Sequence, residues 1–388
     1  MNIPSGLYIK NAWTGAGIAS FVHVASKLDK SINVLFDCGS IEPSCLKANN
    51  IFITHGHTDH CGAMIQHARS RGLSHNYANY YVPPSCLDSV MAAKAAFEQL
   101  DGKEISMNIF IFQPNIDSIQ LSPSLRIVAF DTIHRVPSQG YAIYYQPKPK
   151  IMNKYKHLSS KEINALRKEH IQYTEICPEV LQFVYTGDTT FEGLLQPHVQ
   201  FIFKSPILVL ECTYLDVDDS KSYQKSIEYG HIYIDDIIKY KHHFIDVQYV
   251  VLVHFSMKYT PFYQAIDKIN GCLPVELLEK CYGCMKALGS REYITKIMNN
   301  PNNSNNNGYN GYNNSVGYGW GSHKRTIQRG VDKQKQPRSV SSNSCSVSNS
   351  RNNNNNNNNN SDNNNYNNSN NSIETVFTNN LSNLNVHR

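Results

Sequence analysis

The chain has 388 residues, long enough for two domains, but residues 299–388 contain 32 asparagines and few large apolar side chains. Such a segment cannot bury enough apolar surface to offset the entropy of ordering, which predicts a folded domain over residues 1–298 and a disordered Asn/Ser-rich tail over residues 299–388. The net charge of +5 comes from the tail, because the first 298 residues hold 28 basic and 28 acidic side chains. Total charge therefore gives no argument for nucleic acid, and any such argument must come from local patches.

The sequence indicates an intracellular protein, cytoplasmic or nuclear, with no membrane partner. Its first residues, MNIPSGLYIK, lack the basic and apolar regions of a secretory signal, and its apolar runs have strand length. The ten cysteines are expected to be reduced thiols. Cys281 and Cys284, near Cys272, could indicate a structural zinc site, but one CxxC without a second pair is a weak signal.

Along the first 298 residues, short apolar runs of strand length alternate with segments of helical periodicity. Strands are expected at residues 21–25, 33–37, 51–53, 79–82, 109–112, 125–130, 141–145, 181–186, 207–212 and 249–255. Helices are expected at residues 60–72, 85–100, 160–169, 220–229, 233–243 and 261–269. Strands that first cluster and then alternate with helices predict a layered α/β domain in which helices cover the sheets.

The segment THGHTDHCG follows the predicted strand at 51–53 and carries three histidines and an aspartate. Side chains on a turn at a strand end converge, so His55 and His57 can hold one ion while Asp59 and His60 turn toward a second. Imidazole and carboxylate are ligands for zinc, and a mixed set of N and O donors is typical of catalytic sites. The segment therefore predicts a catalytic metal site.

One turn supplies at most four ligands, so others must come from elsewhere in the chain. Three candidates stand at the ends of predicted strands: His134 after RIVAFDTI, Asp188 in YTGDTT, and His254 closing YVVLVH. Each alone is more often a core histidine or a helix-capping aspartate, but together they complete two metal sites.

With these residues in this order, the sequence resembles the metallo-β-lactamase superfamily, whose fold is an αββα sandwich of two sheets between helices. The resemblance implies two Zn²⁺ ions per subunit, with Mn²⁺ as a possible replacement. The implied ligands are His55, His57 and His134 for one ion, Asp59, His60 and His254 for the other, and Asp188 bridging both.

Five further motifs narrow the resemblance to tRNase Z, and most closely to its short, plant-cytosolic-like form. They are HRVPSQGY, GDTT, ECTYLD, YGHIYI and HFSMKY, and the similarity runs from about residue 36 to about residue 269. Glyoxalase II-like thioesterases share the THxHxDH pattern but do not need these five motifs together. The interval between Asp188 and His254 is too short for the inserted domain of mRNA 3′-end-processing nucleases.

The resemblance implies a homodimeric, zinc-dependent endoribonuclease that removes the 3′ trailer from precursor tRNA. Cleavage after the discriminator nucleotide would leave a 3′-hydroxyl on the tRNA and a 5′-phosphate on the trailer. Asp59 would orient the attacking water or take its proton. His231 would protonate the departing 3′-oxygen, with the Glu211 carboxylate fixing its tautomer.

Residues 146–178 interrupt the rhythm of strands and carry a local excess of positive charge. Such a run usually marks a solvated helix face, but its place beside the candidate site favours contact with RNA phosphates. It stands where the family has a longer tRNA-clamping arm, and the Pro-x-Lys-x-Arg-Asn loop of many bacterial members is absent. The side chains expected to bind RNA are Lys148, Lys150, Lys154, Lys156 and Lys258, the last of which replaces a usual arginine.

Two other functions remain open from the sequence. One is hydrolysis of a small thioester or phosphodiester, which would have no use for a basic protrusion. The other is a non-catalytic RNA-binding scaffold that keeps the fold, although a scaffold would be expected to have lost some of the metal ligands.

Overall fold

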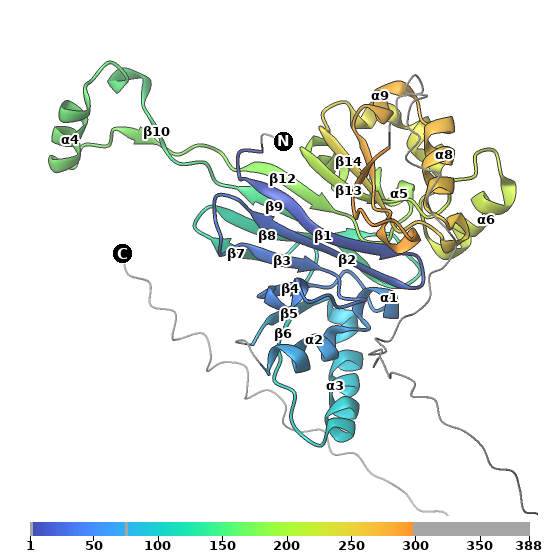
Figure 1. Ribbon diagram of the computed structural model, residues 1–388. Coiled ribbons are helices and arrows are strands. Elements are labelled where there is room, and N and C mark those ends of the chain that lie inside the picture. Colours follow the sequence, from blue (N-terminus) through green and yellow to red (C-terminus); the bar gives the residue numbers. More distant parts are fainter. Residues whose placement is uncertain (1–2, 74–76, 298–388) are drawn as a thin grey trace, which may run out of the picture. The chain divides into compact units, whose positions relative to one another are not determined.

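The computed structural model describes residues 3–73 and 77–297, and the predicted tail at 299–388 lies outside them. In the described part, two β-sheets stack face to face and helices cover both outer faces (Figure 1). This arrangement confirms the predicted αββα sandwich. None of the helices described has both the length and the apolar character that a membrane span requires.

The first sheet has six strands in the order β1-β2-β3-β4-β5-β6. Its first three strands are antiparallel neighbours, and β3 to β6 run parallel. The strands are β1 (Leu7–Gly15), β2 (Ala19–Ser26), β3 (Asn33–Phe36), β4 (Asn50–Phe52), β5 (Asn79–Val82) and β6 (Asn108–Ile111).

The second sheet has eight strands in the order β16-β15-β14-β13-β12-β9-β8-β7. They are β7 (Ser118–Ser122), β8 (Leu125–Thr132), β9 (Ser138–Tyr145), β12 (Val180–Tyr185), β13 (Ile207–Glu211), β14 (Tyr249–Val253), β15 (Cys281–Gly283) and β16 (Thr295–Lys296). The central strands β12 to β15 are parallel. Because helices and the other sheet cover both of their faces, β13 and β14 have the apolar sequences ILVL and YVVLV, and Glu211 ends β13.

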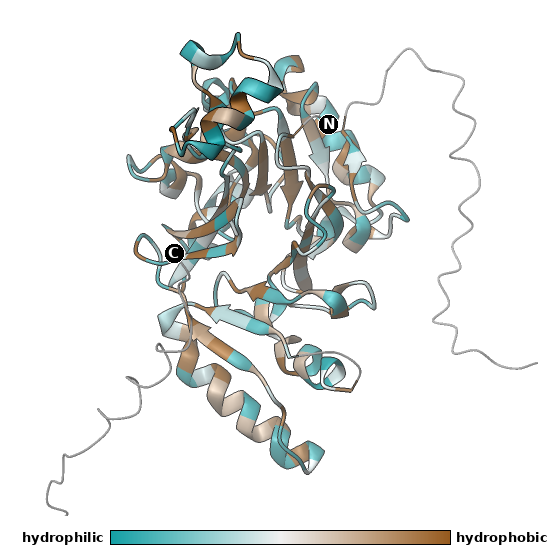
Figure 2. Ribbon diagram, turned by 90° about the vertical axis from the view of Figure 1, so that its left-hand side faces the viewer, coloured by the Kyte–Doolittle hydropathy of each residue, from teal (hydrophilic) through white to brown (hydrophobic). Residues whose placement is uncertain are grey.

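The apolar core forms three layers, and hydrophobic residues follow the strands of both sheets (Figure 2). Between the sheets, the ring of Phe36 lies 5.5 to 5.6 Å from those of Tyr141, Phe183 and Tyr185, so it joins β3 to the second sheet. The two outer layers lie between each sheet and its helices.

Helices cover the two outer faces of the sandwich, and α4 lies apart from both. The structure contains α1 (Thr58–Cys61), α2 (Met64–Arg71), α3 (Leu87–Asp101), α4 (Ser160–Lys168), α5 (Phe191–Leu194), α6 (Ser220–Tyr229), α7 (Ile234–Lys239), α8 (Tyr263–Cys272) and α9 (Val275–Leu278). Residues of α2 and α3 pack on the first sheet, and residues of α5, α7, α8 and α9 pack on the second.

All ten predicted strands are present, within a few residues of the expected bounds. The sequence did not predict β1, β7, β15 or β16, nor the two short strands β10 (Lys150–Ile151) and β11 (Thr174–Glu175). In β1, a change of register between Ile9 and Asn11 breaks the alternation of buried and exposed positions that identifies a strand. Cys281 belongs to β15, and the buried Cys284 follows it. Among the described residues, the groups able to hold a metal ion contain no cysteine.

The helix predicted at 60–72 is two helices, α1 and α2. The backbone of Cys38 interrupts it, because its N–H donates to the carbonyl of His60 at 2.6 Å and its carbonyl accepts from Ala63 N–H at 2.8 Å. These bonds replace helical ones and turn the chain after Gly62. The interruption fixes α1, which carries part of the candidate site, against the end of β3.

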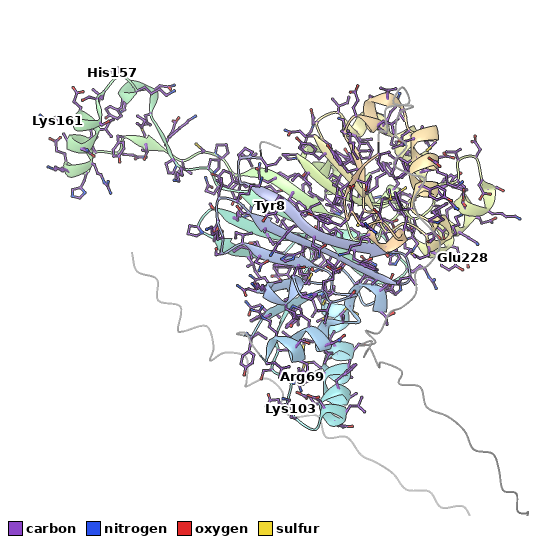
Figure 3. All side chains as sticks on the ribbon, viewed as in Figure 1. Tyr8, Arg69, Lys103, His157, Lys161 and Glu228 are labelled. Atoms are coloured by element: carbon purple, nitrogen blue, oxygen red, sulfur yellow. The ribbon has the colours of Figure 1, made fainter. Side chains whose placement is uncertain are left out.

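The basic segment forms a small ordered arm between β9 and β12. It contains the strand pair β10 (Lys150–Ile151) and β11 (Thr174–Glu175) and the helix α4, which Ser159 and Glu162 cap reciprocally. No residue of α4 is buried. Figure 3 shows His157 and Lys161 on this arm, with side chains that do not pack on the sheets.

Candidate metal centre

The residues predicted to form the site come together where strands of both sheets end. Parallel strands that end at one edge of a sandwich bring the following loops into contact. The site collects His55 and His57 after β4, Asp59 and His60 in α1, His134 after β8, Asp188 after β12, Glu211 at the end of β13, His231 after α6, and His254 after β14.

The loop that carries the first four residues is held by close backbone contact. A Cβ atom on Gly39 would lie 1.8 Å from the carbonyl oxygen of Asp59, so only glycine fits there. His254 has a left-handed backbone (φ 62°), which its N–H bond to Thr14 Oγ1 at 3.0 Å helps to hold. Such a conformation costs about 1–3 kcal/mol outside glycine and often occurs at functional sites.

Two histidines are oriented by hydrogen-bond acceptors behind their rings. The hydroxyl of Thr54 donates to Asp37 Oδ1 at 2.9 Å, so it accepts the Nδ1 hydrogen of His55, also at 2.9 Å. Nδ1 of His134 donates to the backbone carbonyl of Gly230 at 2.8 Å. A neutral imidazole carries one hydrogen, so Nε2 of each ring presents a lone pair.

These lone pairs converge on one point. Nε2 of His55 lies 3.0 Å from Nδ1 of His57, and Nε2 of His134 lies 3.3 Å from the same atom. Asp188 Oδ2 stands 3.8 and 4.0 Å from the two Nε2 atoms. Burial lowers the pKa of all three histidines, which favours the neutral imidazoles that metal coordination requires.

A second pair of histidines is held in the same manner. Nδ1 of His60 donates to Asp37 Oδ2 at 2.7 Å. The hydroxyl of Thr213 donates to Glu211 Oε2 at 3.0 Å and accepts the Nδ1 hydrogen of His254 at 3.0 Å. Outer acceptors of this kind fix the tautomer and orientation of metal-binding histidines in proteins.

The second pair also turns its Nε2 atoms toward a common centre. They lie 3.2 Å apart, and Asp188 Oδ2 is 3.2 Å from His60 and 3.3 Å from His254. Asp59 Oδ2 is 3.4 Å from Nε2 of His254 and 3.7 Å from Nε2 of His60. Asp188 thus stands between both groups of donors.

The carboxylates in this cluster favour a positive charge at its centre. Burial lowers the pKa of His60, but the carboxylates of Asp188 and Asp37 outweigh burial and raise that pKa well above its ordinary value. Burial raises the pKa of Asp188, but His254 and His60 hold it well below its ordinary value. Converging lone pairs around a buried carboxylate fit divalent cations, and the mixed N and O donor set is suited to zinc.

A separate histidine–carboxylate pair borders this cluster. Nδ1 of His231 lies 2.9 Å from Glu211 Oε1 and 3.9 Å from Asp188 Oδ2. Glu211 is fully buried, and its carboxylate also accepts from the N–H groups of Thr189 and Thr213. Burial lowers the pKa of His231, but the neighbouring Glu211 carboxylate raises it to about 9. A cation bound beside Asp188 would lower this pKa again by repulsion.

Asp37, which follows β3, was not predicted to belong to the site. Its buried carboxylate accepts from His60, from the N–H and hydroxyl of Thr54 and, at 2.8 Å, from the hydroxyl of Tyr185. An aspartate after a strand is common in turns, so the sequence offered only the strand end as a signal. Its role depends on contacts with residues 17 to 148 positions away.

The predicted RNA-binding lysines lie in two places. Lys148, Lys150, Lys154 and Lys156 are exposed on the arm, and Lys150 pairs with Glu175 at 3.2 Å. The ammonium group of Lys258 lies 2.6 Å from Asp216 Oδ2 near the site.

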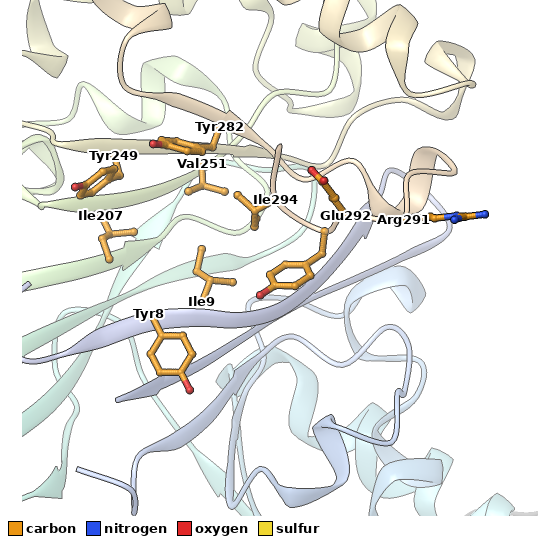
Figure 4. A pocket seen from close by; sticks show the side chains of 10 residues that line it. Tyr8, Ile9, Ile207, Tyr249, Val251, Tyr282, Arg291, Glu292 and Ile294 are labelled. Atoms are coloured by element: carbon orange, nitrogen blue, oxygen red, sulfur yellow. The ribbon is translucent and has the colours of Figure 1, made fainter. Parts of the chain in front are cut away.

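One large cavity lies away from this site. It has a volume of about 480 Å³ and opens beside Tyr8, Ile207 and Tyr249 (Figure 4). Ile207 and Tyr249 begin β13 and β14, whereas the candidate site lies at the opposite ends of those strands. The cavity contains none of the site residues.

The αββα sandwich and the histidine–aspartate cluster at its strand ends define a metal-dependent hydrolase of the metallo-β-lactamase superfamily. The chain is 31% identical over 247 residues to tRNase Z TRZ1 of Arabidopsis thaliana, a match that covers 63% of this chain and 85% of the relative. It is 29% identical to the chloroplastic tRNase Z TRZ2 of the same plant, over 63% of this chain and 67% of the relative.

The structure of human tRNase Z, short form, aligns with 65% of this chain and 93% of its own, at 19% identity and a TM-score of 0.44. No family model matches the chain. On the sequence similarity to the plant proteins, the chain belongs to the tRNase Z family.

Replacing Asp37 by asparagine should weaken metal binding by about 10- to 100-fold, with zinc as the test ion, because His60 would lose the charged acceptor that orients it. Zinc affinity would be measured by competition with a chelator. Tyr185→Phe is the control, since it removes one hydrogen bond to Asp37 but keeps its charge. Equal affinities for the wild type and Asp37→Asn would show that Asp37 does not support the site.

Proposed function

We propose that this protein is a zinc-dependent endoribonuclease that removes the 3′ trailer from precursor tRNA by cutting after the discriminator nucleotide. The observation that carries the proposal is the convergence of imidazole Nε2 atoms around Asp188, with the His231–Glu211 pair beside them. Membership of the tRNase Z family supports precursor tRNA as the substrate.

The donors support two Zn²⁺ ions per subunit, with Mn²⁺ as a possible replacement. His55, His57 and His134 would hold one ion, Asp59, His60 and His254 the other, and Asp188 would bridge them. When bound, such ions lower the pKa of water to roughly 7 and stabilise negative charge on phosphoryl oxygens.

Asp59 would orient the attacking water. Its side chain is about one-tenth exposed, and the N–H of Gly17 donates to its Oδ2 at 2.8 Å. Burial raises the pKa of Asp59, but the hydrogen bond and charge of His254 and the charge of His60 outweigh burial and hold it below its ordinary value. A carboxylate with a low pKa is a weak base. Asp59 is therefore better suited to orienting the attacking water than to holding the proton that this water releases.

His231 would supply the proton that the departing 3′-oxygen needs. Glu211 accepts the Nδ1 hydrogen, which leaves Nε2–H of the imidazolium free to donate. The tRNA would leave with a 3′-hydroxyl and the trailer with a 5′-phosphate. Glu211 is fully buried and accepts from four donors, which keep this acceptor fixed in place.

The arm would bind tRNA through its phosphates. Lys148, Lys150, Lys154 and Lys156 are exposed there. Phosphate contacts of this kind carry little sequence information, which suits an enzyme that accepts many tRNAs. Lys258 would contact RNA nearer the cut by exchanging its partner Asp216 for a phosphate. A small thioester or phosphodiester would need none of these charges.

A homodimer would place the arm of one subunit over RNA cut by the other. The helix α3 supports association, because it exposes Phe97 (45%) and Leu100 (84%). We further propose an intracellular location, cytoplasmic or nuclear, since precursor tRNA is processed inside cells.

The decisive experiment incubates the zinc-loaded protein with a 3′-extended precursor tRNA and maps the products. A single cut after the discriminator nucleotide is expected, and Asp59→Ala should abolish it while circular dichroism shows that the domain stays folded. Chelation should also remove activity, and added zinc should restore it. A wild-type protein that hydrolyses bis-p-nitrophenyl phosphate but never this RNA would contradict the assigned substrate.

His231→Ala should lower kcat on precursor tRNA by about 10²- to 10⁴-fold, because the departing oxygen loses its acid. Zinc content, measured by atomic emission, should stay at the wild-type value. Loss of zinc from this variant would instead make His231 a metal ligand.

Replacing Lys148, Lys150, Lys154 and Lys156 by serine should raise KM for precursor tRNA. The slope of log affinity against log salt should fall by about 3, as expected when four phosphate contacts are lost. Four other exposed lysines changed together, Lys27, Lys30, Lys47 and Lys103, give a control with the same change in net charge. Similar effects in both variants would argue against the arm as the RNA-binding element.

A further inference from the structure

A cavity of about 520 Å³ opens beside the metal centre between α5, α6 and α7. Its volume lies in the usual range for sites that bind small organic groups. His231 is one of its lining residues, so the proposed acid belongs to both the cavity and the centre.

The orientation of His231 connects the two spaces. Its Nδ1 faces Glu211, so Nε2 lies on the opposite side of the ring. The ring centroid is 5.1 Å from that of His134 and 5.1 Å from that of His254, and 13% of the side chain is exposed. A group that accepts the Nε2 proton of His231 must therefore lie on the side of the ring that faces away from Glu211.

The cavity wall on α6 carries two large side chains that are open to solvent, with the buried Ser226 between them. Tyr223 and Ile227 line it one helical turn apart and are 50% and 60% exposed. On the other side, the ring of Tyr240 stacks on Phe191 with centroids 5.1 Å apart. An exposed aromatic side chain at such a wall offers a surface on which a nucleobase can stack.

Polar groups complete the cavity. The ammonium of Lys239 lies 4.8 Å from the ring centroid of Tyr240, at an exposed position suited to a phosphate. The carboxylates of Glu192 and Asp236 also line the cavity and can accept hydrogen bonds from base amino groups. This combination of an aromatic wall, a cation and acceptors matches one nucleotide.

We propose that this cavity binds the base of the nucleotide whose 3′-oxygen leaves, the last nucleotide of the tRNA product. The inference rests on the proposed function, because it takes His231 as the group that protonates that oxygen. A nucleotide bonded to this oxygen has its base within reach of Tyr223. Stacking accepts every base, which suits a position that varies among tRNAs.

The test compares three precursor tRNAs: one intact, one without the base of the last tRNA nucleotide, and one without the base of the first trailer nucleotide. They are cut by the zinc-loaded wild type, Tyr223→Ala and Ile227→Ala. Gln224→Ala is the control, since Gln224 is exposed on the same helix and does not line the cavity.

Tyr223→Ala should lower kcat/KM on the intact RNA by about 5- to 150-fold, the effect of losing one base–aromatic stack. Ile227→Ala should lower it less, and Gln224→Ala should cut as the wild type does. Removing the base of the last tRNA nucleotide should lower the kcat/KM of the wild type by as much as Tyr223→Ala does on intact RNA. The variant acting on the RNA without that base should have nearly the same kcat/KM as either single change.

Independent, additive losses would overturn the inference, as would a Tyr223→Ala variant that cuts intact RNA at the wild-type rate. If the effect of Tyr223→Ala disappears instead on the RNA without the base of the first trailer nucleotide, the cavity binds the trailer and the assignment is wrong. A wild type that cuts none of the RNAs would overturn the proposed function itself, and this inference with it.

Discussion

The site depends on one repeated interaction, an acceptor placed behind the ring of each candidate ligand histidine except His57. Thr54, Asp37, Gly230 and Thr213 take the Nδ1 hydrogens of four histidines, which leaves every Nε2 facing inward. The acceptors lie in four different loops, which follow β3 and β4 of the first sheet, β13 of the second sheet, and α6. Any change in how the sheets stack would therefore turn the lone pairs away from a common centre.

The buried carboxylate of Glu211 joins the metal-binding and proton-donating parts of the site. One oxygen accepts from His231, and the other accepts from Thr213, which in turn holds His254. Four donors offset the cost of burying this charge. A single strand end, at β13, thus positions both a candidate ligand and the candidate acid.

Much of the fold could be predicted from the sequence, because most strands are continuous apolar runs. The strand β1 was missed where its register shifts near Asn11, and the first helix was expected to continue where Cys38 interrupts it. Asp37 was missed for a related reason. Asp37 is important because it contacts Thr54, His60 and Tyr185. These residues are distant in the sequence, so the residues next to Asp37 do not indicate the contacts.

The sequence by itself determined the chemistry available to this protein: the histidines and aspartates of the cluster, their order, and the motif that contains His231. Those features depend on residue type and spacing, which a single chain shows directly. Only the tertiary structure decided which ring nitrogen faces the centre, that Asp37 supports it, and that His231 opens onto a cavity beside Tyr223. Hydrogen-bond direction and cavity shape arise from distant segments packed together, so local sequence cannot specify them.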